Sequence, residues 1–84
     1  MTHKHHLELE NGIQLQCIVV ESATLVKVAL DLYWENDLPQ PFLKQVDLWV
    51  GEIVNPYLKE NTRPVELCQK RPSGKVTIAR WNPS

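Results

Sequence analysis

The sequence has few of the residues that build common catalytic and cofactor motifs. Its three glycines are scattered, which excludes a glycine-rich phosphate loop. The two cysteines, Cys17 and Cys68, form no C-x-x-C pair, so the sequence has no structural-zinc or thioredoxin-like signature. No apolar run approaches the ~18 residues of a membrane span, and the N-terminus lacks the apolar core of a secretory signal. We therefore expect a cytoplasmic protein with two reduced thiols, no cofactor and no membrane partner.

The residues that are present predict a small globular domain. The chain has 84 residues, of which 43% are hydrophobic and 23% charged, and its net charge is −1. This composition is too apolar and too balanced in charge for an intrinsically disordered chain. The length suits one domain near the lower limit for independent folding. We predict a single domain over residues 1–84, with a frayed terminus over residues 1–5.

A β-hairpin is predicted for residues 5–20, where leucine and isoleucine alternate with Glu and Gln on both sides of an Asn-Gly pair. A three-residue turn that ends in a left-handed Gly12 pairs Leu9 with Ile13 and gathers the apolar side chains on one face. Residues 17–20 are apolar without alternation, which predicts burial on both faces or a bulge.

Residues 25–34 predict a strand, because apolar residues such as Val26, Val28 and Leu30 recur with a period of two. A helix with Ser22 as its N-cap is the alternative.

An amphipathic helix is predicted for residues 40–54, with Pro41 in its first turn. Pro56 lacks an N–H group and should end this helix, and a short second helix over residues 56–60 should follow. The apolar stripe consists of Phe42, Val46, Trp49, Val50, Ile53 and Val54.

A second hairpin is predicted around a Pro-Ser-Gly turn that ends in a left-handed Gly74. This register pairs Arg71 with Lys75 and Cys68 with Ile78. Further along, the opposed pairs are Val65 and Trp81, Glu66 and Arg80, and Leu67 and Ala79. One apolar face, of Val65, Leu67, Ala79 and Trp81, suits the core. The second, of Cys68, Val76 and Ile78, would meet another layer or another chain.

These elements predict an α+β fold in the order β-β-β-α-β-β. An antiparallel sheet of about five strands, formed by two β-hairpins and one central strand, packs against one long amphipathic helix.

Three histidines, His3, His5 and His6, lie within four residues, and imidazole is a ligand for zinc, copper and nickel. No second Cys or His cluster is available to complete a ligand set. We therefore expect no metal site. The alternative is a metal site formed by these three histidines.

No residue has the surroundings of an activated nucleophile. The hairpin register sets His5 opposite Cys17, but apolar neighbours raise the pKa of a thiol and no third group is present to orient the pair. We expect no enzymatic activity.

Charge is distributed unevenly along the chain. Residues 1–58 carry three Lys and eight acidic residues, whereas residues 59–84 carry six Lys or Arg and two acidic residues. A basic β-ribbon with an aromatic side chain is able to follow a phosphate backbone. However, the pI of about 6.3 lies far below the ~9 of dedicated nucleic-acid modules.

We therefore predict a small non-enzymatic regulatory or accessory protein that binds another protein. The alternative is nucleic-acid binding through the basic C-terminal hairpin, and a homodimer through an edge strand or an apolar face is also consistent with the pattern. Leu48, on the polar side of the helix, is part of the predicted surface. The predicted binding residues are Leu48, Arg63, Lys70, Arg71, Lys75, Val76, Ile78, Arg80 and Trp81.

Overall fold

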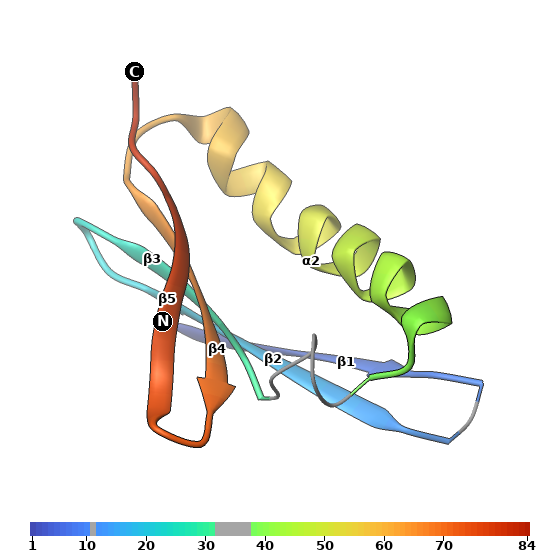
Figure 1. Ribbon diagram of the computed structural model, residues 1–84. Coiled ribbons are helices and arrows are strands. Elements are labelled where there is room, and N and C mark those ends of the chain that lie inside the picture. The colour runs from blue at the N-terminus through green and yellow to red at the C-terminus, as the bar shows by residue number, and fades with distance from the viewer. Residues whose placement is uncertain (11, 32–37) are drawn as a thin grey trace.

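The computed structural model describes residues 1–10, 12–31 and 38–84. The described residues form β1 (Thr2–Glu8), β2 (Gln14–Glu21), β3 (Val26–Leu30), α2 (Gln40–Glu60), β4 (Val65–Arg71) and β5 (Gly74–Trp81). The strands form one sheet in the order β1-β2-β3-β4-β5, with α2 on one face (Figure 1). The α+β class and the order of the elements are confirmed.

The sheet is mixed, so the prediction of an antiparallel sheet was wrong. β3 runs parallel to β4, with Val26 opposite Val65 and Val28 opposite Leu67. The other neighbours, β1–β2, β2–β3 and β4–β5, are antiparallel. A hairpin forces its two strands to be antiparallel, whereas a helix between two strands returns the chain to the end where the first strand began. The crossover through α2 therefore makes β4 enter the sheet in the direction of β3.

The N-terminus is part of the sheet, so the predicted fraying of residues 1–5 was also wrong. β1 begins at Thr2, which lies opposite Val20. The ammonium group of Met1 donates a hydrogen bond of 2.8 Å to the carbonyl of Glu21. In return, the Glu21 N–H group donates one of 2.7 Å to the carbonyl of Met1. Backbone pairing therefore holds the chain from its first residue.

The predicted register of the first hairpin is confirmed. Leu7 lies opposite Leu15, and the Leu9 N–H group donates to the Ile13 carbonyl at 2.8 Å. Gly12 has a φ of +85°, as the left-handed position of the turn requires. Asn11 lies outside the described residues.

Strand β2 buries one face only, which corrects the expectation for residues 17–20. Cys17 and Val19 are fully buried, but Val20 is 45% exposed on the opposite face. The strand prediction for residues 25–34 is confirmed over β3, and residues 32–34 lie outside the described residues.

One helix replaces the two predicted helices, because α2 continues through Pro56. Proline at this position removes a donor to the carbonyl of Glu52 and crowds that group. The continued helix lets Tyr57 and Leu58 pack against the core. The predicted stripe is confirmed, and its buried members are Val46, Val50, Ile53 and Val54.

The second hairpin follows the predicted register at its open end but departs from it near the turn. β5 has one extra residue between the partners of Leu67 and Cys68, so Cys68 lies opposite Thr77 and Arg71 lies opposite Gly74. The predicted second apolar face does not form, because Ile78 packs against the core while Cys68 lies beside Thr77. A two-residue turn closes the strands, and the bulge absorbs the offset.

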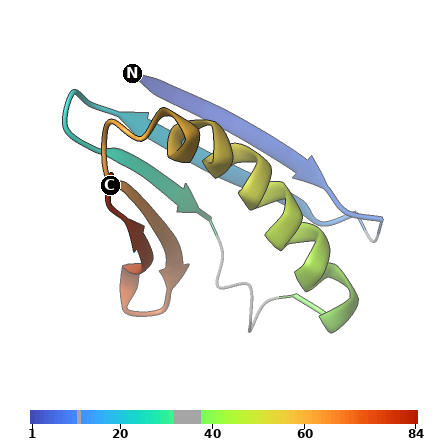
Figure 2. The ribbon, with the colours of Figure 1, turned by 90° about the horizontal axis from the view of Figure 1, so that it is seen from above.

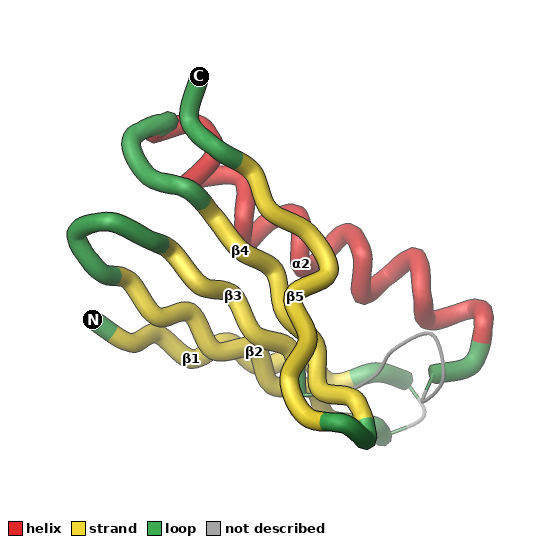
Figure 3. The backbone as a smooth tube through the Cα atoms, turned by 60° about the vertical axis from the view of Figure 1, so that its left-hand side comes forward, coloured by secondary structure: helices red, strands yellow, loops and turns green. Residues whose placement is uncertain are grey.

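The helix covers only part of the sheet. Seen from above, α2 runs over β1–β3, whereas the β4–β5 hairpin extends beyond it (Figure 2). β1 and β5 are the two outer strands (Figure 3). Each flank of α2 therefore faces an outer part of the sheet.

Replacing Pro56 by Ala should raise the free energy of unfolding by about 1–3 kcal/mol, because Ala restores the donor to the Glu52 carbonyl and removes the ring. Urea unfolding measures the change. Pro41→Ala is the matched control and should give no gain, since the first helical turn needs no such donor. An unchanged or lower value for Pro56→Ala would contradict the continuous helix.

Candidate functional site

A groove runs along the β5 flank of α2. Its volume is about 220 Å³, and most of its lining is apolar. Val50, Val54 and Leu58 recur on this flank at helical spacing, and they face Leu67 from β4 and Trp81 from β5. The indole of Trp81 remains 38% exposed. Val50, Val54 and Leu67 are buried and form the floor of the groove, so the apolar surface that it presents comes from Trp81 and the half-buried Leu58.

Gly51 lies in the middle of α2 and lines this groove. A Cβ atom at this position would meet nothing within 4 Å. Glycine inside a helix costs about 1 kcal/mol relative to Ala, and no neighbour in the described structure requires it. Gly51 leaves an open place where another molecule is able to approach the helix backbone.

The groove continues toward the C-terminal end of α2. A second hollow of about 210 Å³ shares Leu58 and Trp81 with the first and extends to Asn61. From Asp47 to Asn61 the helix axis spans roughly 21 Å at ~1.5 Å per residue. The two hollows together follow about four helical turns.

A network of polar groups ties the end of α2 to β1 and β2. Nε2 of His3 lies 2.7 Å from Oε2 of Glu21, and the Tyr57 hydroxyl donates to the same oxygen at 3.3 Å. Arg63 donates to Glu21 and to Glu60, each at 3.1 Å. Three segments far apart in the sequence, residues 3, 21 and 57–63, therefore meet at one carboxylate.

These contacts shift the ionisation of the network. The hydrogen bond with His3 is the largest contribution that lowers the pKa of Glu21; burial opposes it, and Arg63 and Tyr57 lower the pKa further. Burial and the adjacent Glu21 carboxylate raise the pKa of Tyr57. The hydrogen bond to Glu21 also raises the pKa of Arg63. We interpret the network as a structural clamp, because its charges are paired within the protein.

The predicted basic residues do not form one continuous face. Arg63 belongs to the network at Glu21, and Arg80 pairs with Glu66 across the hairpin. Nζ of Lys70 lies 3.9 Å from the Asp31 carboxylate. Lys75 forms no ion pair with any residue that the structure describes. The hairpin tip carries Lys70, Arg71 and Lys75, and the other two cations lie at its open end.

The predicted apolar binding residues are also separated. Leu48 is 62% exposed on the side of α2 that faces away from the sheet. Val76 and Ile78 are half-buried in β5. Of this set, Trp81 lines the groove beside α2.

The histidines and cysteines form no reactive group. His5 lies opposite Cys17 as predicted, but burial raises the pKa of Cys17 to about 11, so its thiol is protonated at neutral pH. His3 and His5 share one face of β1, and His6 lies on the other. Across the described ranges, no three His, Cys, Asp or Glu side chains are grouped to hold a metal.

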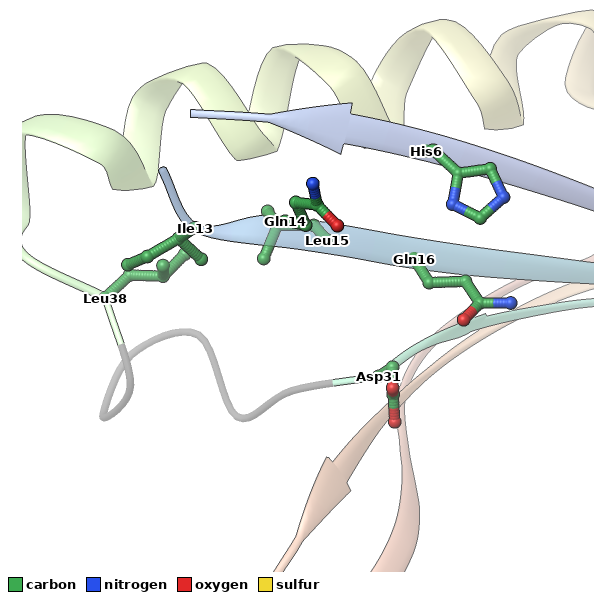
Figure 4. A pocket seen from close by; sticks show the side chains of 7 residues that line it. All are labelled: His6, Ile13, Gln14, Leu15, Gln16, Asp31 and Leu38. Atoms are coloured by element: carbon green, nitrogen blue, oxygen red, sulfur yellow. The ribbon is translucent and has the colours of Figure 1, made fainter. Parts of the chain in front are cut away.

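A larger hollow, of about 360 Å³, lies beside the first hairpin (Figure 4). The carboxylate of Asp31 in this hollow is near Lys70, and in the described part of the chain it forms no ion pair with His6. Among the described residues that line the hollow, His6 and Asp31 therefore form no acid–base pair. It is lined by His6, Ile13, Gln14, Leu15, Gln16, Asp31 and Leu38.

Comparison with protein-family models, curated proteins and solved structures gives no significant match to this chain. In the portion that the structure describes, no helix has both the length and the hydrophobicity to cross a bilayer. The groove on the β5 flank of α2 is thus identified from geometry. Its sequence signal is Gly51, a helix-disfavouring residue within an amphipathic pattern.

Glu21→Gln should lower stability at neutral pH and flatten its dependence on acid. The folded-state pKa of Glu21 is lowered, so ionisation of this carboxyl stabilises the fold above about pH 4.3, and this contribution is lost as the pH falls through the folded-state pKa. Urea unfolding at pH 7 and at successively lower pH measures both effects. Parallel pH profiles for the wild type and Glu21→Gln would show that Glu21 has no such role.

Proposed function

We propose that this protein is a non-enzymatic accessory protein that binds another protein through the groove between α2 and β5. The observation that carries the proposal is the open Gly51 position beside the apolar side chains of Val54, Leu58 and Trp81. An apolar surface next to a small residue suits close packing of a partner.

An amphipathic helix is the partner segment that best suits the dimensions of this groove. The axes of five strands span roughly 19 Å, at about 4.8 Å between neighbours, and a helix with side chains is about 10 Å wide. One helix therefore covers about half of the sheet, and α2 runs over β1–β3. A second helix, packed about 8–10 Å from α2, would lie over the β4–β5 hairpin.

Nucleic-acid binding has weaker support than protein binding. Arg63 and Arg80 are paired with carboxylates, and Lys70 lies near Asp31. Lys75 at the hairpin tip, which forms no ion pair with a described residue, is what remains in favour of this alternative. This alternative predicts that substitutions at the hairpin tip reduce binding and that substitutions in the groove do not.

Gly51→Arg should abolish partner binding without unfolding the protein. Its side chain would fill the groove from a position where a Cβ meets nothing. Gly51→Ala should raise the free energy of unfolding by about 0.5–1 kcal/mol, which shows that the fold accepts a side chain here. Affinity capture from a nuclease-treated lysate of the native host, quantified by mass spectrometry, measures binding. Any specific partner should be retained by the wild type and reduced at least ~10-fold by Gly51→Arg, a loss of about 1.4 kcal/mol or more.

Gln45→Arg is the matched control, since Gln45 is exposed on α2 and does not line the groove. At ~100° per residue it lies about 120° around the helix from Gly51. Gln45→Arg should retain the same partner as the wild type. Equal capture by all variants would contradict the proposal. Material that is captured from an untreated lysate but not from the nuclease-treated one, or that is lost in the Lys70→Glu/Lys75→Glu variant alone, would favour nucleic-acid binding instead.

A further inference from the structure

The two outer strands of the sheet differ in how well they are protected. β5 carries a bulge and the cations Lys75 and Arg80, features that discourage pairing with another strand. β1 has seven residues in continuous register with β2, without a bulge. Within the described sheet its other side faces no strand. β1 therefore offers a regular row of backbone donors and acceptors.

A hollow accompanies this edge on the helix side. Its volume is about 310 Å³, and it lies between β1 and the flank of α2 that faces away from β5. His5 contributes from β1, and Trp49, Pro56 and Tyr57 contribute an apolar wall from α2. A strand added to β1 would direct every second side chain toward this wall.

We propose that β1 pairs with β1 of a second copy of this chain, in a two-fold symmetric dimer with one continuous sheet. In the antiparallel register centred on His6, Lys4 of each copy lies opposite Glu8 of the other. On the helix side, Leu7 of the second copy lies opposite His5, next to the hollow. Opposite charges then pair on one face of the two strands, and Leu7 packs next to the hollow on the other.

Charge complementarity favours a second copy over a different protein as the occupant. Lys4 and Glu8 are exposed, and neither forms an ion pair with any described residue. Because they stand four residues apart on one face, a two-fold axis through His6 brings opposite charges together twice. A register shifted by two residues keeps the faces but loses both Lys4–Glu8 pairs. One shift sets Lys4 opposite His6, and the other sets Lys4 opposite Glu10, which lies beyond the end of β1.

The other outer strand gives the opposite result. A fully overlapped antiparallel pair of β5 strands sets Lys75 opposite Arg80 at both ends, which is destabilising. Self-association through a strand edge is therefore assigned to β1. This site is independent of the α2–β5 groove, which lies on the other flank of the helix.

Sedimentation equilibrium of the full chain over about three decades of concentration tests the dimer. The wild type should reach twice the monomer mass of 9.7 kDa. Lys4→Glu and Glu8→Lys each place like charges opposite one another at both positions, so each variant alone should dissociate at least ~10-fold more readily. Circular dichroism checks that both variants fold.

An equimolar mixture of Lys4→Glu and Glu8→Lys restores opposite charges at both positions. It should recover the dimer mass, which would identify the strand and its register together. Gly51→Arg should dimerise like the wild type, so failure of the groove and failure of the dimer are distinguishable. A wild type that is monomeric at every concentration, single variants that remain dimeric, or a mixture that stays monomeric would each overturn the proposal.

Discussion

The width of the sheet compared with the width of one helix is the constraint on which the rest of this structure depends. α2 has 21 residues and must bury the apolar face of five strands. Packing over β1–β3 lets it cover fully buried side chains such as Val19, Val28 and Leu30. β5 is then left at the margin, where Trp81 stays partly exposed. The α2–β5 groove and the hollow beside β1 both follow from this difference in width.

Continuation of α2 through Pro56 extends the part of the sheet that this one helix covers. A helix that ended at residue 54 would leave Tyr57 and Leu58 without their places against the core. Tyr57 also donates to Glu21, so the last turn of the helix is connected to β2 and, through His3, to β1. The local cost of a proline is offset by this packing and by these hydrogen bonds.

Much of the fold could be predicted because local patterns determine it. Alternation and Gly12 specify the first hairpin, and helical periodicity specifies the buried face of α2. The direction of β4 could not be predicted, since the hydrophobic pattern of a strand is the same in parallel and antiparallel pairs. Arg71 pairs with Gly74 across a two-residue turn, whereas Val65 pairs with Trp81 at the open end, and these two registers differ by one residue. The bulge in β5 accommodates this residue, so neither the turn nor the open end predicts the bulge by itself.

The candidate site was less predictable, because it depends on contacts between distant segments. Arg63 belongs by sequence to the basic hairpin, yet folding brings it to Glu21. Trp81 was predicted to bind a partner, but its neighbours Val54 and Leu58 belong to a helix whose crossing over the sheet the sequence does not specify. Gly51 was not among the predicted residues. A glycine within an amphipathic helix pattern is a signal in the sequence, but the open space beside it is known from the structure alone.

The openness of the β5 flank of α2 is the most direct test of this interpretation. The alkylation rate of a Gly51→Cys variant in the native state measures it, because Cys17 and Cys68 are buried and provide the unreactive reference. We expect the new thiol to react nearly as fast as that of Leu48→Cys on the exposed side of the helix. A rate as slow as that of the buried cysteines would show that the flank is already covered, and the groove would then not exist.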